Sequence, residues 1–325
     1  MTPVAIAKSG AAALAADVLA GFAQSPRTLP SRWFYDRRGS ELFRRISQLN
    51  EYYPTQCESD ILLRHKADFA AALPSGRLRV WELGAGDGTK TEVLLAELLR
   101  REVTVEYLPV DICDDVLEDL AERMRRCFSR WPLTISPVPA TYEEAFVRRA
   151  SSNRVSNLVL FLGSSIGNMH HEEARLFLTS LRSRLNPGDC LLIGFDLKKD
   201  PRIMQAAYDD PTGVTRQFNL NLLDRLNREL DATFDKSKFR HHCTYNAEKG
   251  RMESWLLSTE PQEIVLAALE RAYFFDAWEG IHVESSYKYD LNEIASLARA
   301  SGFAVRRHFF DSKHYFVDSW LTVPS

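Results

Sequence analysis

Two glycine-containing loops carry the residues of this 325-residue chain that could do chemistry. The segment Gly163-Ser164-Ser165-Ile166-Gly167 has the G-x-S-x-G spacing of a hydrolase nucleophile elbow, and it follows the apolar run of residues 157–162. A hydrolase would use Ser165 as its nucleophile and would need an acid and a histidine later in the chain. Seven of the eight histidines follow Ser165, so their number leaves this alternative open.

The second loop, Glu82-Leu83-Gly84-Ala85-Gly86-Asp87-Gly88-Thr89, joins a predicted strand to a predicted helix. A dinucleotide-binding G-x-G-x-x-G motif would need glycine at position 89, which is threonine here. The E-x-G-x-G form is typical of S-adenosylmethionine (SAM) enzymes, whose ligand has no pyrophosphate. Asp111 ends the next predicted strand at about the spacing expected of a ribose-binding acid. These features favour a SAM site, and the alternative is an ordinary tight turn beside a surface aspartate.

Predicted helices and strands alternate from about residue 55, which indicates a doubly wound parallel α/β sheet. The predicted strands are residues 78–83, 103–110, 133–138, 157–162 and 190–195, and the predicted helices are 58–72, 89–101, 114–129, 142–150 and 172–185. After a helix at 291–300, strand runs at 303–311 and 313–321 with almost no connection predict a C-terminal antiparallel hairpin. That ending resembles class I SAM methyltransferases, which implies their Rossmann-like sheet.

Two regions fall outside this repeat and predict a second lobe. Residues 1–54 contain helices, and residues 197–287 contain helices to about residue 230 and strand-like runs at 251–258 and 263–269. We therefore expect a SAM-binding Rossmann-like domain made of residues 55–196 with 288–325. An α+β substrate-binding lobe, made of residues 1–54 with 197–287, is expected over the carboxyl edge of the sheet.

Composition excludes several classes of function. The hydrophobic share of 45% and the charged share of 26% are those of a globular protein. A net charge of −3 gives no electrostatic reason for a nucleic-acid or membrane partner. The apolar runs are strand-sized, and the Ala-rich N-terminal residues predict an amphipathic helix and not a signal peptide.

The five cysteines lack C-x-x-C spacing, so we expect neither a disulfide framework nor a zinc site. His241-His242-Cys243 is interpreted as a polar strand end, because adjacent side chains point in different directions. No metal is expected, and the predicted compartment is the cytoplasm. The predicted partner is a small molecule, an amino-acid substrate, and the protein is predicted to be a monomer.

Five segments together resemble the histidine-specific SAM-dependent methyltransferases, and the resemblance covers residue 28 to the end. They are Trp33-Phe34-Tyr35-Asp36, Glu51-Tyr52-Tyr53-Pro54-Thr55, residues 161–168, Ala207-Tyr208-Asp209-Asp210 and Leu226-Asn227-Arg228-Glu229-Leu230. The best-known member of that family trimethylates the α-amino group of L-histidine to hercynine in ergothioneine biosynthesis. The resemblance implies the same activity here.

The resemblance also implies roles for individual residues. Asn168 and Tyr208 would hold the amino-acid backbone and are the catalytic candidates. Further substrate contacts are implied at Phe43, Tyr52, Gly163, Ser254, Glu284 and Ser286. Cofactor contacts are expected at Tyr35, Glu82, Gly84, Gly86, Lys90, Asp111, Thr141 and Tyr142. Independently of the family, Glu284 and Ser286 are two positions apart, so on a strand both would face one side and could pair with the two imidazole nitrogens.

The chain departs from the family pattern at three places. Thr141 stands where an acid often contacts adenine, Ser254 stands where the well-known member has methionine, and Gly86-Asp87-Gly88-Thr89 replaces a Gly-Thr-Ser-Glu type of loop. Ser254 could change the size or polarity of the pocket, which leaves a different, aromatic amino acid as an alternative substrate. A non-catalytic SAM-binding protein is the other alternative. In class I methyltransferases the loop after the fourth strand presents the substrate, which favours Asn168 over Ser165 as its functional residue.

Overall fold

The computed structural model describes residues 3–147 and 155–324. The chain divides into two compact units, each made of two separate segments. The mixed unit comprises Met1–Tyr52 and Asp200–Ser286, and the sheet unit comprises Tyr53–Lys199 and Tyr287–Ser325. The chain therefore passes between the units three times, directly after Tyr52, Lys199 and Ser286.

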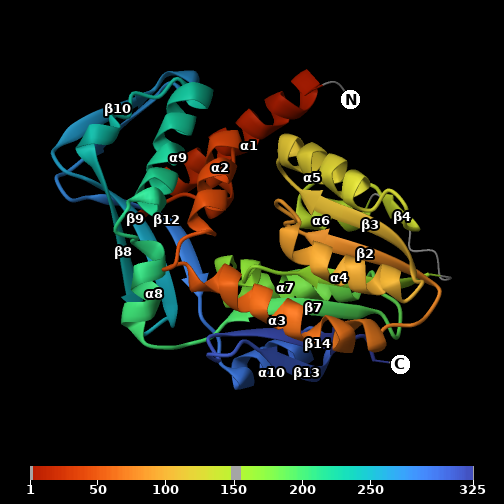
Figure 1. The fold of residues 1–325 in the computed structure, drawn as a ribbon. Helices are drawn as coiled ribbons and strands as arrows, with labels where there is room; N and C mark the ends of the chain where they lie inside the picture. The colour runs from red at the N-terminus through yellow and green to blue at the C-terminus, as the bar shows by residue number, and fades with distance from the viewer. Residues whose placement is uncertain (1–2, 148–154, 325) are drawn as a thin grey trace. The chain divides into compact units, whose positions relative to one another are not determined.

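The sheet unit is built on one large sheet with the order β13-β14-β7-β6-β2-β3-β4, and β5 also pairs with β3 (Figure 1). Its strands are β2 (Arg77–Leu83), β3 (Thr104–Asp111), β4 (Leu133–Ile135), β5 (Val138–Pro139), β6 (Ser156–Phe161), β7 (Cys190–Asp196), β13 (Ala304–Phe310) and β14 (Phe316–Thr322). Strands β2 to β7 pair in parallel, whereas β14 is antiparallel to both β7 and β13. This arrangement confirms the predicted Rossmann-like sheet with a terminal antiparallel hairpin.

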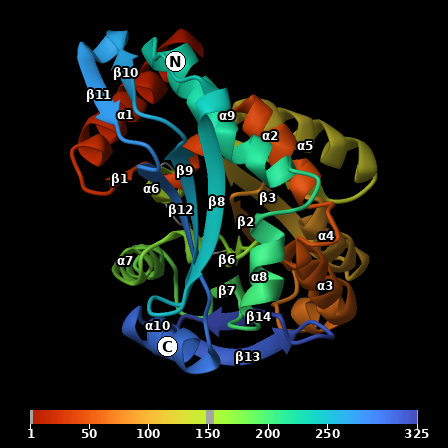
Figure 2. The same cartoon turned by 90° about the vertical axis from the view of Figure 1, so that its left-hand side faces the viewer.

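Helices cover both faces of this sheet (Figure 2). They are α3 (Tyr53–Ala71), α4 (Thr89–Arg100), α5 (Asp114–Cys127), α6 (Tyr142–Val147), α7 (His171–Arg182) and α10 (Leu291–Ala300). On one face, Leu178 of α7 and Ile294 of α10 belong to the buried cluster that contains Val159 of β6. On the other face, Phe69 of α3 stacks on Trp320 with ring centroids 5.8 Å apart. Central strands buried on both sides explain the continuous apolar runs in the sequence.

Two predicted strands of this unit differ in extent from the observed ones. The run predicted at 133–138 is interrupted between β4 and β5, because Pro137 has no N–H to donate to the ladder. The run predicted at 313–321 begins only at Phe316, since the Asp311 carboxylate accepts hydrogen bonds from the backbone N–H groups of Tyr315 (2.7 Å) and Phe316 (2.8 Å) and holds a turn. Residues 148–150 of the helix predicted at 142–150 lie outside the described residues.

The mixed unit contains a four-stranded sheet of order β1-β12-β9-β8 and a separate hairpin, β10-β11. Its elements are α1 (Pro3–Phe22), β1 (Arg27–Thr28), α2 (Arg37–Ile46), α8 (Pro201–Tyr208), α9 (Val214–Leu230), β8 (Phe239–Asn246), β9 (Arg251–Ser258), β10 (Gln262–Leu266), β11 (Arg271–Phe275) and β12 (Gly280–Tyr287), whose last residue belongs to the sheet unit. The core buries Phe218 and Leu222 of α9 with Leu256 of β9 and Val283 of β12. An amphipathic helix thus covers one face of the sheet.

Two sequence interpretations in the mixed unit are wrong. His241-His242-Cys243 lies inside β8 and not at a strand end, with His241 and Cys243 buried and His242 exposed. Burial lowers the pKa of His241 to about 4, so its imidazole is neutral at physiological pH. The run predicted at 263–269 leaves the strand after Leu266, because a 3₁₀ turn and the left-handed backbone of Glu270 (φ 52°) lead into β11.

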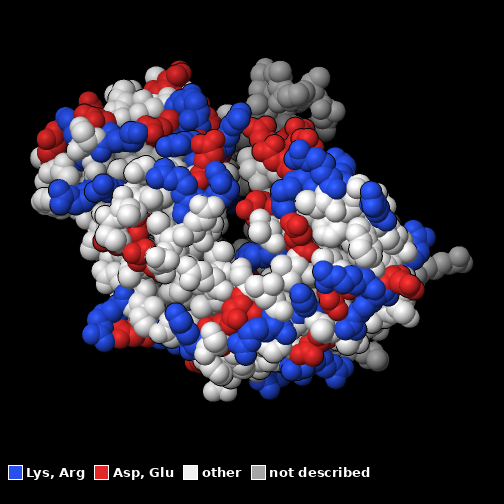
Figure 3. All heavy atoms as spheres, viewed as in Figure 1, with Lys and Arg blue, Asp and Glu red and all other residues white. Residues whose placement is uncertain are grey.

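The surface and the cysteines add three observations. Lys and Arg are interspersed with Asp and Glu over the visible face in Figure 3. Within residues 3–147 and 155–324, no helix is long and apolar enough to cross a membrane. All five cysteines are free thiols, and the same described residues contain no group of three or more His, Cys, Asp or Glu side chains that could hold a metal ion.

Candidate active site

The loop after β2 presents an open backbone surface at the carboxyl edge of the sheet. Gly84, Gly86 and Gly88 all have positive φ angles, of 70°, 52° and 65°. No heavy atom lies within 4 Å of where a β-carbon on Gly86 would be. The N–H groups of Gly84 (2.9 Å) and Ala85 (3.0 Å) donate to the carbonyl of Val110, which fixes the loop to β3. The loop therefore leaves room for a ligand to approach the backbone at Gly86.

Glu82 lies beneath this loop and is almost completely buried. One of its carboxylate oxygens accepts a hydrogen bond from the Thr91 hydroxyl (2.6 Å), and the other accepts one from the Tyr107 hydroxyl. Burial raises the pKa of Glu82 to about 7 despite these hydrogen bonds. Glu82, the first residue of the E-x-G-x-G motif, thus connects the start of the loop to α4 and β3.

Asp111 ends β3, beside the loop. Its Oδ2 accepts the N–H of Gly86 (3.1 Å) and its Oδ1 accepts the N–H of Cys113 (3.1 Å). Burial raises the pKa of this carboxyl above its ordinary value, although the backbone hydrogen bonds act in the opposite direction. Each carboxylate oxygen can accept a second hydrogen bond, so the group has capacity for ribose hydroxyls.

Tyr142 stands over Gly84. Its ring packs edge-on against Phe161 with centroids 5.2 Å apart, and its hydroxyl lies 2.8 Å from where a Gly84 β-carbon would be. Thr141 is exposed and precedes α6, and its N–H donates to the Glu144 carboxylate at 3.1 Å. The structure therefore brings Gly84, Gly86, Asp111 and Tyr142 together at one edge of the sheet.

Lys90 belongs to a buried charge cluster that the sequence did not reveal. Its ammonium forms an ion pair with Glu58, whose side chain is fully buried. Burial alone lowers the pKa of Lys90, but the charge of Glu58 outweighs it and the net pKa is raised. Glu58 also accepts the Gly163 N–H with both oxygens, at 2.7 and 2.9 Å. Glu58 thus links α4 to the loop after β6.

The loop after β6 does not have the geometry of a hydrolase elbow. Ser164, and not Ser165, has the left-handed backbone of a sharp turn (φ 56°), and the Ser165 hydroxyl donates to the Leu162 carbonyl at 2.9 Å. In an elbow the strained residue is the nucleophile, exposed at the tip of the turn. Asn168 ends the short 3₁₀ helix Ser165–Asn168 and is exposed. These observations argue against Ser165 as a nucleophile and show that Asn168 is accessible at the end of the loop.

Four predicted substrate residues form two hydrogen-bonded pairs in the mixed unit. The Ser254 hydroxyl donates to Oε2 of Glu284 at 3.0 Å, and the Tyr208 hydroxyl donates to the Ser286 hydroxyl at 2.7 Å. Ser254, Ser286 and Tyr208 are buried, and Glu284 is partly buried. A hydroxyl of β12 therefore lies next to a phenol of α8, and a carboxylate of the same strand lies next to a hydroxyl of β9.

The pleat of β12 is irregular at this place. The His282 ring is 4.8 Å from the Trp255 ring, whereas Glu284 bonds to Ser254, the neighbouring residue on β9. Ser254 and Trp255 are neighbours on β9, so their side chains face opposite sides of the sheet. Their partners Glu284 and His282 therefore also face opposite sides, although these two residues are two positions apart in β12. The regular alternation of side chains along β12 is therefore broken between His282 and Glu284, and this break places the Glu284 side chain on the same face of the sheet as Ser254.

Three predicted aromatic residues cluster in the same unit. The Phe43 ring lies 5.5 Å from the Tyr35 ring and 5.9 Å from the Tyr52 ring, both edge-on. All three are partly buried and pack against the core that contains Phe218. Such a cluster offers ring edges and hydroxyl groups at a half-exposed apolar surface.

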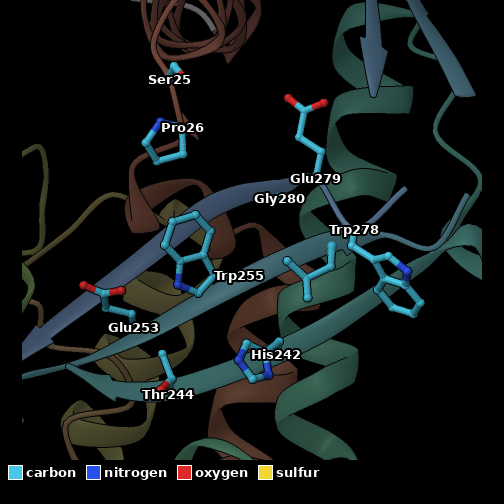
Figure 4. A pocket seen from close by; sticks show the side chains of 10 residues that line it. Ser25, Pro26, His242, Thr244, Glu253, Trp255, Trp278, Glu279 and Gly280 are labelled. Carbon is cyan, nitrogen blue, oxygen red and sulfur yellow. The ribbon is translucent and has the colours of Figure 1, made fainter. Parts of the chain in front are cut away.

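A hollow of about 610 Å³ lies on the face of the four-stranded sheet that is opposite to the Ser254–Glu284 pair (Figure 4). Its lining includes His242 and Thr244 of β8 and Glu253 and Trp255 of β9. Because Trp255 and Ser254 face opposite sides, this hollow is separate from the Ser254–Glu284 pair. None of the site residues predicted from the sequence lines it.

The Gly84 position gives a test of the loop. We expect Gly84→Ala to weaken SAM binding about tenfold, because positive φ is strained for alanine by roughly 1–2 kcal/mol and its β-carbon would displace the Tyr142 hydroxyl. Calorimetric titration with SAM measures this. Gly188→Ala is the matched control, since Gly188 also has positive φ (88°) but no heavy atom within 4 Å of its β-carbon position. Equal SAM affinity in the two variants would contradict the expectation.

A doubly wound sheet with a terminal antiparallel hairpin and an E-x-G-x-G loop facing an acid on the next strand defines a class I SAM-dependent methyltransferase. A family model described as histidine-specific methyltransferase, SAM-dependent, matches residues 14–323. The chain belongs to this family.

Individual relatives agree with that assignment. The chain is 39% identical to the histidine N-alpha-methyltransferase of Mycobacterium tuberculosis over 294 residues, which cover 90% of both chains. It is 31% identical to ergothioneine biosynthesis protein 1 of Neurospora crassa, over 85% of this chain and 31% of that one. Among solved structures, it is similar to magnesium protoporphyrin IX methyltransferase from Synechocystis PCC 6803, with a TM-score of 0.46, 14% identity and coverage of 90% and 97%.

Proposed function

We propose that this chain transfers methyl groups from SAM to the α-amino nitrogen of L-histidine and yields the trimethylated betaine hercynine. The observation that carries the proposal is that Glu284 bonds to Ser254 and Ser286 bonds to Tyr208, so strand β12 carries, two positions apart, a carboxylate and a hydroxyl that can pair with the two nitrogens of an imidazole. Family membership and the names of the relatives support the same substrate. We further propose that the protein acts on the free amino acid as a monomer in the cytoplasm, in keeping with its free thiols.

The sheet unit is proposed to bind SAM. The open backbone at Gly86 and the spare hydrogen-bonding capacity of Asp111 fit the amino-acid and ribose parts of that molecule. Gly84, Lys90, Thr141 and Tyr142 are the further proposed contacts in this unit, and Glu82 is proposed to act by holding the loop. SAM supplies a methyl group on a positively charged sulfur.

The mixed unit is proposed to bind histidine. Glu284 and Ser286 would bind the imidazole, with Tyr52 and Phe43 at its edge and Ser254 orienting Glu284. Tyr208 of this unit would hold the amino-acid backbone. Asn168 belongs to the sheet unit, on the loop that contains Gly163, and is proposed as a further contact of the amino acid. The main contribution of these residues is to align the nitrogen lone pair and exclude water.

Each transfer needs a neutral amine, because an ammonium has no lone pair. The proton must therefore leave before each attack, and we assign no dedicated base to this step. The Asn168 amide oxygen can accept an N–H of the unmethylated and monomethylated amines, and of the dimethylated ammonium before its proton leaves, while the amide N–H group can donate to an oxygen of the substrate.

An aromatic amino acid other than histidine is the second candidate substrate. Ser254 favours it, since a small buried hydroxyl stands where the well-known member of the family has methionine, which changes the size and polarity of the pocket.

The deciding experiment is mass spectrometry of the purified protein incubated with SAM and an equimolar mixture of the proteinogenic amino acids. Histidine with three hydrogens replaced by methyl groups is the expected product. A methylated aromatic amino acid instead would support the second candidate. SAM binding without any methylated product would overturn both and leave a non-catalytic SAM-binding protein.

Ser254→Ala provides a smaller test. Loss of a hydrogen bond to a charged group costs about 1.5 kcal/mol, so we expect KM for histidine to rise about tenfold while kcat changes little. Ser258→Ala is the control, because Ser258 is a buried serine of the same strand whose hydroxyl donates to the Glu260 carbonyl. Steady-state kinetics with varied histidine should separate the two variants. If both give the same KM, Ser254 does not orient Glu284.

A further inference from the structure

Asp196 is the centre of a buried polar cluster that the proposed mechanism does not use. It is the last residue of β7, and its side chain is 1% exposed. The carboxylate accepts the Tyr53 hydroxyl at 2.8 and 2.9 Å, the Lys288 ammonium at 2.7 Å, and the Lys199 ammonium. All four residues belong to the sheet unit.

The three partners of Asp196 mark the three places where the chain changes unit. Tyr53 directly follows the first passage, Lys199 directly precedes the second, and Lys288 lies two residues after Ser286. The Lys199 ammonium also bonds to the Tyr53 hydroxyl at 3.0 Å. One carboxylate thus ties all three connecting segments to the end of one strand.

Asp196 is also bonded to the loop that carries Asn168. Its backbone N–H donates to the Ser164 hydroxyl at 3.0 Å, and its carbonyl accepts the Tyr289 N–H at 3.0 Å. In the same loop, Gly167 lies so close to Tyr287 that a β-carbon there would be 2.8 Å from the Tyr287 carbonyl oxygen. Asn168 follows Gly167 in the chain and Ser286 precedes Tyr287, so the two proposed substrate residues each neighbour this contact.

The electrostatics favour an ionised carboxylate in the cluster. Burial alone raises the pKa of Asp196, but the attraction of Lys288 and Lys199 outweighs it and lowers the net pKa. Burial lowers the pKa of Lys199, and Asp196 opposes that shift. Removing the carboxylate charge would leave two buried ammonium groups without it, so their segments would have to rearrange.

We propose that Asp196 is a positioning residue of the methyl transfer, which sets the loop of Asn168 in register with the segment that follows Ser286. This inference rests on the proposed function, because its effect is read in histidine methylation. It predicts that loss of the Asp196 charge slows turnover in protein that still folds and binds SAM.

The test compares Asp196→Asn with Asp189→Asn. Asp189 directly precedes β7, is 3% exposed, and accepts the backbone and side-chain N–H groups of Asn157 and the backbone N–H of Asn186. We expect Asp196→Asn to lower kcat about tenfold or more while the Kd for SAM stays within about twofold, since misplacement by about 1 Å can cost up to 100-fold. Asp189→Asn should lower the melting temperature and leave kcat unchanged. The Asp196 variant should also accumulate mono- and dimethylated histidine.

Each other outcome has a defined meaning. Equal kcat in the two variants would overturn the positioning role, as would a loss of kcat and SAM binding in the same proportion. If Asp196→Asn does not fold, Tyr53→Phe and Ser164→Ala each remove one hydroxyl group of the cluster, and wild-type kcat in both would overturn the role. Wild-type protein that does not methylate histidine would instead overturn the proposed function itself.

Discussion

Replacing Asn168 with alanine should lower kcat about 100-fold while the affinity for SAM stays unchanged. The amide would no longer hold the amine in line with the methyl group, and loss of alignment by about 1 Å can cost two orders of magnitude. SAM affinity should persist because the Gly84–Gly88 loop follows β2 and Asp111 ends β3, whereas Asn168 lies in the loop after β6. Single-turnover kinetics with saturating histidine, followed by mass spectrometry, measures the effect on each methyl transfer.

Asn292→Ala is the matched control for this change. Asn292 is an exposed asparagine of the same unit, at the start of α10, and is not placed near either ligand. An Asn168 variant with the catalytic efficiency of the Asn292 variant would exclude the proposed role of the amide.

Replacing Glu284 with alanine should remove most of the preference for histidine. A hydrogen bond to an ionised group contributes about 1.5–3 kcal/mol, so kcat/KM for histidine should fall roughly 10- to 150-fold. Amino acids without an imidazole make no such bond, so their low activity should not fall in parallel. Competition between histidine and phenylalanine in one reaction reports the change in preference directly.

Glu253→Ala is the control for Glu284. Glu253 is a glutamate of the adjacent strand that faces the other side of the sheet and pairs with Arg251. If Glu284→Ala lowers the activity toward every amino acid equally, as loss of folding would, the carboxylate is only structural.

The parallel sheet could be predicted because its strands are buried on both faces and its helices repeat between them. The extent of strand β8 could not be predicted, since His241 places a polar side chain on the buried face of the strand and so hides the period of two. The break in the side-chain alternation of β12, between His282 and Glu284, could not be predicted from the sequence either. It depends on pairing with β9, and no residue type near Val283 marks it.

The site could be predicted only as separate residues. The family motifs indicated Tyr208, Ser254, Glu284 and Ser286, but their pairing joins positions 30 and 78 residues apart, which no local pattern encodes. Glu58 and Asp196 carried no usable signal. One is an acid within a helix and the other ends an apolar strand, and their importance follows from burial and from partners supplied by tertiary structure.

The position of β14 between β7 and β13 has a consequence for synthesis of the protein. A ribosome adds about 5–20 residues per second. Synthesis of β7 is complete when Asp196 is added. Its partner strand β14 (Phe316–Thr322) is synthesised only after more than a hundred further residues. During synthesis this apolar strand therefore lacks its partner for on the order of ten seconds, and an open edge strand of this kind is a template for aggregation. The antiparallel hairpin at the end of the chain therefore prolongs the time during which the edge of β7 is open, compared with the parallel part of the sheet.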